Sequence, residues 1–223
     1  SSDLGNIGIG ILWEAINSEK EDIFIIETSS FQLDSTANFK PKVSLIINIT
    51  PDHLNWHKTY DNYINAKKKV FKNQDNSDYT VLNYDDEILR NMKDEINSNI
   101  IWFSVNRELN KGIYIKGDTI VINDGVKLIE VLPYRDVKIP GRHNLENALA
   151  SIAIGYSLGI DVDIMADVLR TFEGVEHRIE YVTTINDVKF YNDSKGTNSD
   201  ASIKAVEALD GPIILIAGGM DKG

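Results

Sequence analysis

The sequence VSLIINITPDHLNWHKTYDNYINAK spans residues 43–67 and contains the clearest structural signal in the chain. The near-continuous apolar run at 43–49 is typical of a strand buried on both faces of a parallel sheet. Pro51 ends that strand because proline has no N–H to donate. Asp52 and His53 therefore follow the carboxyl end of a strand, where open α/β sheets bind their ligands. A turn and a helix cap would explain the same two residues equally well.

The composition indicates an acidic protein with enough apolar residues for a packed core. The 223 residues are 42% hydrophobic and 26% charged, which suits one large domain or one and a half ordinary ones. A net charge of −11 argues against nucleic acid as a main partner, and anionic substrates would need local cations. The absence of cysteine fits a reducing, cytoplasmic compartment. No apolar stretch is long enough to span a membrane, and the N-terminus does not read as a signal peptide.

A second buried strand is predicted at residues 23–26, and Glu27 follows it directly. About a dozen residues, the length that a parallel crossover needs, separate it from the strand at 43. We therefore expect Glu27 and His53 at the same edge of two neighbouring parallel strands. A carboxylate and an imidazole at that edge would make a Mg²⁺ or acid–base site. A surface glutamate at a strand end is the simpler alternative.

Residues 61–73 are predicted to form a helix that carries three consecutive lysines, of which Lys67 is the first. A lysine triplet is usually a solvated face, and a straight helix from His53 would carry Lys67 about 20 Å away. Residues 54–60 must therefore form a loop that turns the helix back if Lys67 and His53 share a site. Helical spacing turns Lys67 toward the sheet, so we expect it to be partly buried and the other two lysines to face solvent.

The middle of the chain alternates between strand and helix patterns. The predicted elements are a strand at 79–83, a helix at 84–97, a strand at 100–104, an antiparallel hairpin or meander at 113–131, and helices at 143–158 and 163–172. Asn144 reads as an N-cap, and Asn147 faces the same way three residues later. Capping does not explain Asn147, since asparagine is a poor residue for a helix interior.

The two ends of the chain read as incomplete units. A glycine-containing loop at 5–10 precedes a short helix at 11–16, with no strand expected ahead of it. After residue 173 we predict a hairpin at 179–191, a polar loop at 192–198, a helix at 199–209 and a buried strand at 213–217. The strand–polar loop–helix order, with Lys195 in the loop, is typical of an anion site. A domain of about 47 residues from His177 onward is too small to fold alone, so we expect a fragment cut at both ends.

The chain resembles the Mur ligases of peptidoglycan synthesis through short motifs that occur in the family's order. They are GNIG at 5–8, ETSSFQL at 27–33, NITPDH at 48–53, NAK at 65–67, RHNLENA at 142–148, EHR at 176–178, NDSKGTN at 192–198 and GGMDKG at 218–223. GNIG together with SSFQL favours the member of the family that adds D-glutamate. The family's N-terminal UDP-binding domain, its GKT-type phosphate loop and most of its C-terminal domain have no counterpart in these 223 residues.

The resemblance implies an α/β fold with a mainly parallel central sheet flanked by helices, a small antiparallel β addition, and the start of a second Rossmann-like α/β domain. Residues 1–176 would be the central, ATP-binding domain without its start, and 177–223 the truncated beginning of the amino-acid-binding domain. The implied activity is ATP-dependent addition of D-glutamate to UDP-N-acetylmuramoyl-L-alanine through an acyl phosphate, by a cytoplasmic monomer. The 223-residue chain alone is expected to be inactive without the phosphate loop.

The resemblance also implies roles for individual residues, with catalysis by Lys67, His53, Glu27 and Lys195. The implied ligands of two Mg²⁺ ions are Glu27, His53 and a carbamate on Lys67. The implied contacts to ATP are Asn144, Asn147, Arg178 and Asp193. The implied contacts to the UDP-muramoyl substrate and to D-glutamate are Asn6, Ser29, Gln32, His53, Lys195, Thr197 and Lys222. Carbamylation needs a neutral amine, and burial beside Lys68 and Lys69 would lower the pKa of Lys67 in that direction.

Two alternatives remain open. The chain could belong to another Mur-type or folylpolyglutamate synthase-like ligase, which binding of UDP-muramoyl-L-alanine against folate would distinguish. It could also be a non-catalytic binding module, and the codons before Ser1 would test for the phosphate loop that such a module would lack.

Overall fold

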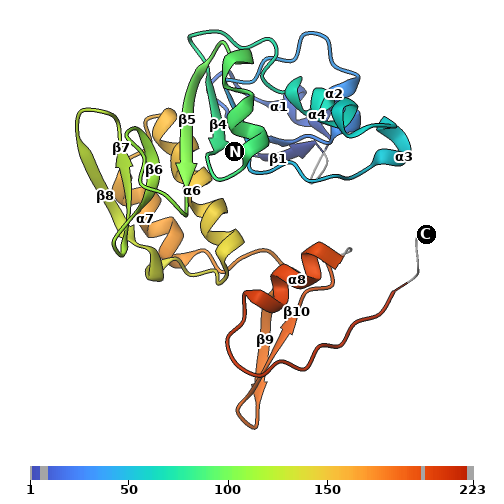
Figure 1. Cartoon of the computed structure of the whole chain (residues 1–223), viewed down its shortest axis with the longest axis vertical. Helices are drawn as coiled ribbons and strands as arrows, with labels where there is room; N and C mark the ends of the chain where they lie inside the picture. Colours follow the sequence, from blue (N-terminus) through green and yellow to red (C-terminus); the bar gives the residue numbers. More distant parts are fainter. Residues whose placement is uncertain (1, 6–9, 197–198, 220–223) are drawn as a thin grey trace.

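The centre of the molecule is a six-stranded mixed sheet with the strand order β3-β4-β5-β6-β7-β8 (Figure 1). The computed structural model describes residues 2–5, 10–196 and 199–219. Pairing is parallel from β3 to β6 and antiparallel from β6 to β8, as the sequence predicts. The strands are β3 (Val43–Ile46), β4 (Tyr79–Asn83), β5 (Asn99–Ser104), β6 (Gly112–Lys116), β7 (Thr119–Asn123) and β8 (Leu128–Pro133).

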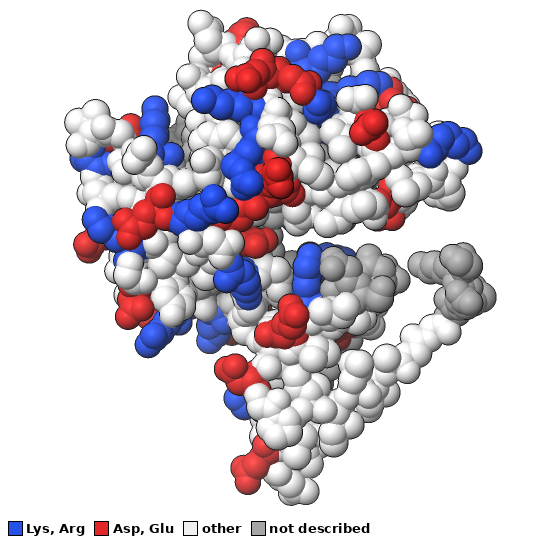
Figure 2. Space-filling view, viewed as in Figure 1, with Lys and Arg blue, Asp and Glu red and all other residues white. Residues whose placement is uncertain are grey.

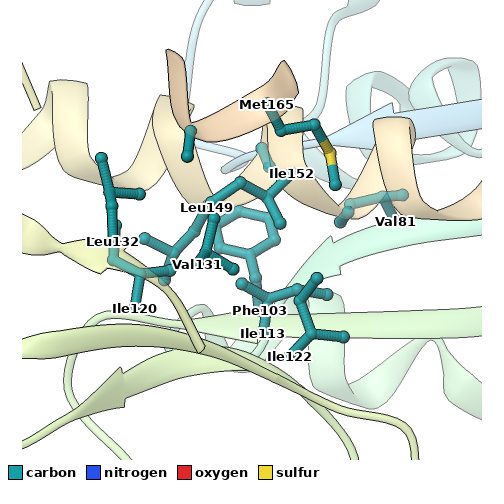
Figure 3. Packing of buried hydrophobic residues seen from close by; sticks show 13 residues of the cluster. Val81, Phe103, Ile113, Ile120, Ile122, Val131, Leu132, Leu149, Ile152 and Met165 are labelled. Carbon is teal, nitrogen blue, oxygen red and sulfur yellow. The ribbon is translucent and has the colours of Figure 1, made fainter. Parts of the chain in front are cut away.

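Two long helices cover one face of this sheet. Helix α6 (Arg142–Ser157) packs across β3, β4, β5 and β6, and α7 (Val162–Thr171) packs against β8. Figure 3 shows Leu149 and Ile152 directed from α6 toward Phe103 of the sheet, and all three side chains are at most 1% exposed. Burying large apolar side chains from both layers is the main stabilisation of such a fold.

The other face of the sheet is covered by shorter elements. These are α2 (Ser30–Asp34), α4 (Tyr60–Lys68), α5 (Glu87–Asn91) and the 3-10 helix Lys93–Glu95, and α3 (Leu54–His57) contacts α4. A second apolar cluster, which includes Leu33, Phe71, Leu82 and Met92, lies beneath them. The single helix predicted at 84–97 is instead two short helices, α5 and the 3-10 helix. The helix predicted at 61–73 ends at Lys68, and turns follow it.

Residues 54–60 are not the simple loop that the sequence predicts, because they contain the short helix α3, but the chain does fold back so that α4 contacts α3. His53 and Lys58 have left-handed backbone φ angles of 54° and 70°. They bracket the single helical turn of α3, and Thr59 then caps α4 by accepting a hydrogen bond from the Asn62 amide. The return of α4 brings Lys67 back toward the sheet.

The N-terminal elements form a separate parallel pair, in which β1 (Ser2–Gly5) is hydrogen bonded to β2 (Phe24–Glu27). Two predictions are wrong here. A strand does precede the glycine-containing loop, and β2 pairs with β1 whereas β3 pairs with β4, so β2 and β3 are not hydrogen-bonded neighbours. The reason is that β1 supplies β2 with a partner along its whole length. The helix predicted at 11–16 is α1 (Ile11–Asn17).

A buried polar network closes the amino end of the sheet. The Gln74 side chain is 3% exposed, and its Nε2 group donates to the carbonyl oxygens of Pro41 and Tyr79. Its Oε1 atom accepts from the hydroxyls of Ser44 and Thr80. Because each of these polar groups has a partner, the network can be buried without a large desolvation penalty.

The C-terminal part consists of a hairpin and a helix. Strands β9 (Glu180–Ile185) and β10 (Val188–Asn192) pair about Asn186 and Asp187, both with positive φ, and α8 (Ser199–Glu207) follows. The strand predicted at 213–217 is absent, and Figure 1 draws this segment as extended coil. Ile214 and Ile216 are 90% and 92% exposed, because no strand among the described residues pairs with the segment.

Candidate functional site

A pocket of about 240 Å³ lies where the segments that follow β2 and β3 meet α4. Thr28 lines it from beyond β2, Asn48 from beyond β3, and Lys67 from α4. Glu27 is the last residue of β2, at the same end. The carboxyl ends of the two strands therefore converge on Lys67, although Glu27 belongs to the β1–β2 pair and not to the central sheet.

Lys67 differs from its two lysine neighbours in its surroundings. Burial lowers the pKa of Lys67, against an opposing effect of the Glu27 and Asp52 carboxylates, which favour the charged amine. Lys68 forms an ion pair of 2.5 Å with Glu95, and Lys69 one of 2.7 Å with Asp34.

The expectation that Lys68 and Lys69 face solvent is wrong, since their side chains are only 22% and 29% exposed. Acidic residues of neighbouring elements hold both lysines against the protein. The lowered pKa of Lys67 comes from burial, and neither Lys68 nor Lys69 is among its causes.

His53 lies beside Lys67 through a shared aromatic neighbour. The His53 ring centroid is 6.4 Å from that of Tyr63, and Lys67 Nζ is 5.7 Å from the same Tyr63 centroid. The His53 Nε2 atom is 3.4 Å from Asp52 Oδ2, and its ring packs on Phe31 at 4.9 Å. The structure thus brings Glu27, His53 and Lys67 into one region, and it adds Asp52 to them.

Ser29 and Gln32 are held together in a capping box at the start of α2. The Gln32 amide donates to Ser29 Oγ at 3.2 Å, and the Ser29 amide donates to Gln32 Oε1 at 2.8 Å. Each residue therefore fixes the other. Because Gln32 Oε1 is used in the cap, its Nε2 group is the part that could donate to a ligand.

Asn144 and Asn147 lie together in the first turns of α6. The prediction that Asn144 is the N-cap is wrong, because Gly141 holds that position with a φ of 100°. Instead, Asn144 Nδ2 donates to the Pro140 carbonyl at 2.6 Å, and Asn147 Nδ2 donates to Asn144 Oδ1 at 3.3 Å. The two amides do face the same way.

The segment after residue 176 approaches the start of α6 at His143. Burial lowers the pKa of His143, the Lys204 and Arg178 cations lower it further, and Asp193 opposes them. Asp193 Oδ1 accepts from the Ile179 amide at 3.0 Å, which fixes the carboxylate. Arg178 and Asp193 therefore lie near His143, at the start of the helix that carries the two asparagines.

Of the remaining predicted site residues, the structure describes only Lys195. Lys195 is exposed, and its backbone amide donates to the His177 carbonyl. Asn6, Thr197 and Lys222 lie outside the described residues. Figure 2 shows acidic and basic side chains interspersed over one face, so the net negative charge is not gathered there in a single patch.

Sequence patterns missed one buried and one partly buried side chain, His57 and Glu146. His57 hydrogen bonds to Ser30 beneath the aromatic side chains, and only the four-residue interval between His53 and His57 hinted at it. Glu146, on α6, has a pKa raised by burial, against the opposing effects of Arg142 and Lys204. Nothing in the local pattern distinguishes this glutamate from a solvated one.

The chain is similar to known ligases in both sequence and fold. The UDP-N-acetylmuramoylalanine–D-glutamate ligase of Thermoanaerobacter sp. (strain X514) is 50% identical over 219 residues, which is 98% of this chain and 48% of that protein. The enzyme of the same name from Clostridioides difficile (strain 630) is 50% identical over 220 residues, 99% of this chain and 49% of that protein. The chain spans about half the length of the curated relatives it matches.

Solved structures of Mur ligases have the same fold. MurF from Acinetobacter baumannii superposes with a TM-score of 0.67 at 17% identity, over 93% of this chain and 48% of that one. MurF ligase from Thermotoga maritima in complex with ADP gives 0.64 at 18% identity, over 93% and 50%. None of the helices within the described residues has both the length and the apolar character that crossing a membrane requires. The Mur ligase middle domain family matches residues 5–155, well over half of the sequence, and the chain therefore belongs to the Mur ligase family.

Proposed function

We propose that the chain is part of an ATP-dependent ligase that joins D-glutamate to UDP-N-acetylmuramoyl-L-alanine in the cytoplasm. The observation that carries the proposal is 50% identity to proteins named for this activity over 98% of the chain. The placement of Glu27 and His53 near Lys67, which lines a pocket, supports it. In this proposal residues 1–176 belong to the central domain and 177–223 to the amino-acid-binding domain.

The proposed reaction has two steps. A carboxylate oxygen of UDP-muramoyl-L-alanine attacks the γ-phosphorus of ATP, ADP leaves, and an acyl phosphate forms. The amine of D-glutamate then attacks the acyl carbon, phosphate leaves, and the amine loses a proton as the amide forms. Positioning and charge stabilisation are the main tasks of the protein in such a transfer.

The ATP side of the site would be built at the start of α6. Asn144 and Asn147 present their amides there, at a helix N-terminus whose dipole favours anions. Arg178 would pair with the γ-phosphate, since a guanidinium binds phosphate oxygens in a forked geometry. The backbone bond from Ile179 would hold Asp193 in a fixed orientation toward the nucleotide.

The residues around Lys67 would fit Mg²⁺ if Lys67 carries a carbamate. Among the described residues, no group of three or more His, Cys, Asp or Glu side chains could hold a metal ion. Glu27 and His53 therefore need a further oxygen ligand, and a carbamate on Lys67 supplies one. The lowered pKa of Lys67 favours the neutral amine that reacts with CO₂. We propose two Mg²⁺ ions here, which when bound would neutralise charge on the transferring phosphoryl group.

The other substrates would bind on either side of this centre. Ser29 and Gln32 at the start of α2, together with Asn6 and His53, would contact the UDP-muramoyl substrate. Lys195, Thr197 and Lys222 would hold D-glutamate, where cations suit its two carboxylates. These cations and the Mg²⁺ ions let an acidic protein hold anionic substrates.

The test is turnover by the full-length gene product with ATP and UDP-muramoyl-L-alanine. Phosphate release and the mass of the product are measured with D-glutamate, L-glutamate or meso-diaminopimelate as the amino acid, and with folate replacing the muramoyl substrate. We expect product only with D-glutamate and the muramoyl nucleotide. Turnover restricted to another pair would assign the chain to a different ligase, and absence of turnover with every pair would refute the proposal.

A further inference from the structure

We propose that His57 is a positioning residue that fixes the start of α2 against the helices that carry His53 and Lys67. The inference rests on the proposed function, because that function assigns substrate contacts to Ser29 and Gln32. In this inference His57 makes no contact with substrate, although it lines a second pocket, of about 370 Å³, that Lys67 does not line. It would act through Ser30, the residue that follows the N-cap of α2.

The bond between His57 and Ser30 is buried. His57 is 6% exposed and Ser30 is 2% exposed, and the distance from His57 Nε2 to Ser30 Oγ is 3.0 Å. The two residues are 27 positions apart, so the bond joins separate elements and is not a local turn. Breaking a buried bond of this kind leaves a polar group without its partner.

Ring contacts join His57 to α2 and to α4. The His57 ring stacks on Phe31 of α2, with centroids 5.5 Å apart and an angle of 23°. It also meets Tyr63 of α4 edge-on at 5.5 Å. Phe31 in turn contacts His53, and Tyr63 lies beside Lys67. One imidazole therefore connects the capping box of α2 with two of the three proposed metal-site residues, His53 and Lys67.

The helices at this point are too short to define their own positions. Helix α2 has five residues and α3 has four, well below the length at which an isolated helix is stable. Two hydrogen bonds hold the backbone of His57 in place. The Asn62 side chain donates from Nδ2 to the His57 carbonyl at 2.9 Å, and the His57 amide donates to the His53 carbonyl at 3.1 Å. The side chain of His57 can thus transmit the position of α3 and α4 to α2.

The experiment compares three variants of the full-length gene product with the wild type. Ser30→Ala removes the hydroxyl, His57→Phe keeps a ring but removes the hydrogen bond, and the third variant combines the two changes. The matched control is Ser44→Ala, since Ser44 is also buried, at 3% exposed, and its hydroxyl is hydrogen bonded to Gln74 at the opposite end of the sheet. Melting temperature, kcat, and KM for the muramoyl substrate and for ATP are measured for each.

We expect each single change at Ser30 or His57 to raise KM for the muramoyl substrate about tenfold, the effect of losing one buried hydrogen bond. The kcat and the KM for ATP should change less than about threefold, and the double variant should be no worse than the singles within about twofold. Ser44→Ala should lower the melting temperature without raising either KM.

An unchanged KM in Ser30→Ala would overturn the inference, and so would the same KM increase in Ser44→Ala. If His57→Phe does not fold, Ser30→Ala and the control decide the question. Failure of the wild type to turn over these substrates would refute the proposed function and this inference together. Turnover by the wild type with unaffected variants would refute this inference alone.

Discussion

Replacing Lys67 by alanine in the full-length gene product should reduce the ligase rate at least about 100-fold. Loss of a residue that only orients a metal ligand already costs about 10–100-fold in metal affinity or activity, and Lys67 would supply a ligand itself. The fold should survive, because the side chain lines a pocket of about 240 Å³ and does not belong to either apolar cluster. We expect a stability change within about 1 kcal/mol, since removing a partly buried ammonium also removes its desolvation penalty.

The assay compares Lys67→Ala, Lys68→Ala and Lys69→Ala at fixed bicarbonate, with and without added formate or acetate. A small carboxylate should occupy the vacated space at Lys67→Ala and restore part of the rate. The other two variants lose partly exposed ion pairs with Glu95 and Asp34, which should cost about 0–1 kcal/mol of stability and leave the rate unchanged. Incorporation of ¹³C-labelled bicarbonate gives a second measurement, because the carbamate carbon signal should be missing in Lys67→Ala alone.

Two results would refute the reasoning. Activity like that of the wild type in Lys67→Ala would remove Lys67 from the metal site. An equal loss of rate in Lys68→Ala would show that the effect follows from the general charge of α4 and not from the one side chain in the pocket.

Acidification from about pH 7 to about pH 5 should weaken the folded state through His143, whose pKa is lowered on folding from its usual 6.5. The unfolded state then binds the proton more tightly than the folded state. The free energy of unfolding therefore falls as the pH drops below 6.5 and through the pKa of the folded state. In chemical unfolding at successive pH values, His143→Gln should reduce this dependence of the unfolding free energy on pH. Gln74→Leu should cost about 2–4 kcal/mol in urea unfolding, because two buried backbone carbonyls lose their donor, whereas Lys72→Ala on the exposed surface should change stability by less than about 0.5 kcal/mol. Gly112→Ala should cost about 2–4 kcal/mol, since φ is +139° and a Cβ atom would lie 2.3 Å from the Trp102 carbonyl oxygen; an unchanged melting temperature would contradict this.

Local patterns predicted most elements of the fold but not all of their pairings. The apolar runs around β3, β4 and β5 and the turns of the antiparallel strands are strong local signals. The strand β1 contains only one large apolar residue, Leu4, and gave no such signal. Without β1, the order of the chain made β2 and β3 the natural neighbours. The apolar segment at 213–217 shows the opposite error, because an apolar run becomes a strand only where a partner strand pairs with it.

The candidate site was predictable where helical spacing governs it. That spacing placed Lys67 toward the sheet and Asn147 beside Asn144. It could not show that Lys68 and Lys69 are paired, because Glu95 and Asp34 come from other elements. The bond between His57 and Ser30 depends on tertiary contacts for the same reason. Contacts between residues far apart in the chain follow from the fold and not from local sequence.

The two proposed binding surfaces of the candidate site, at the start of α6 and at the start of α2, differ in how rigidly the fold holds them. Asn144 and Asn147 stand on the first turns of a 16-residue helix whose next turns, at Leu149 and Ile152, are locked in the core. Ser29 and Gln32 stand at the start of a five-residue helix that places one side chain, Leu33, in the second apolar cluster and is otherwise held by contacts with His57 and Lys69. Local opening should therefore require less free energy at α2 than at α6. The nucleotide-binding surface at α6 should therefore be preformed, whereas the surface at α2 should change conformation when its ligand binds. Ligand binding should then slow amide hydrogen exchange far more at α2 than at α6.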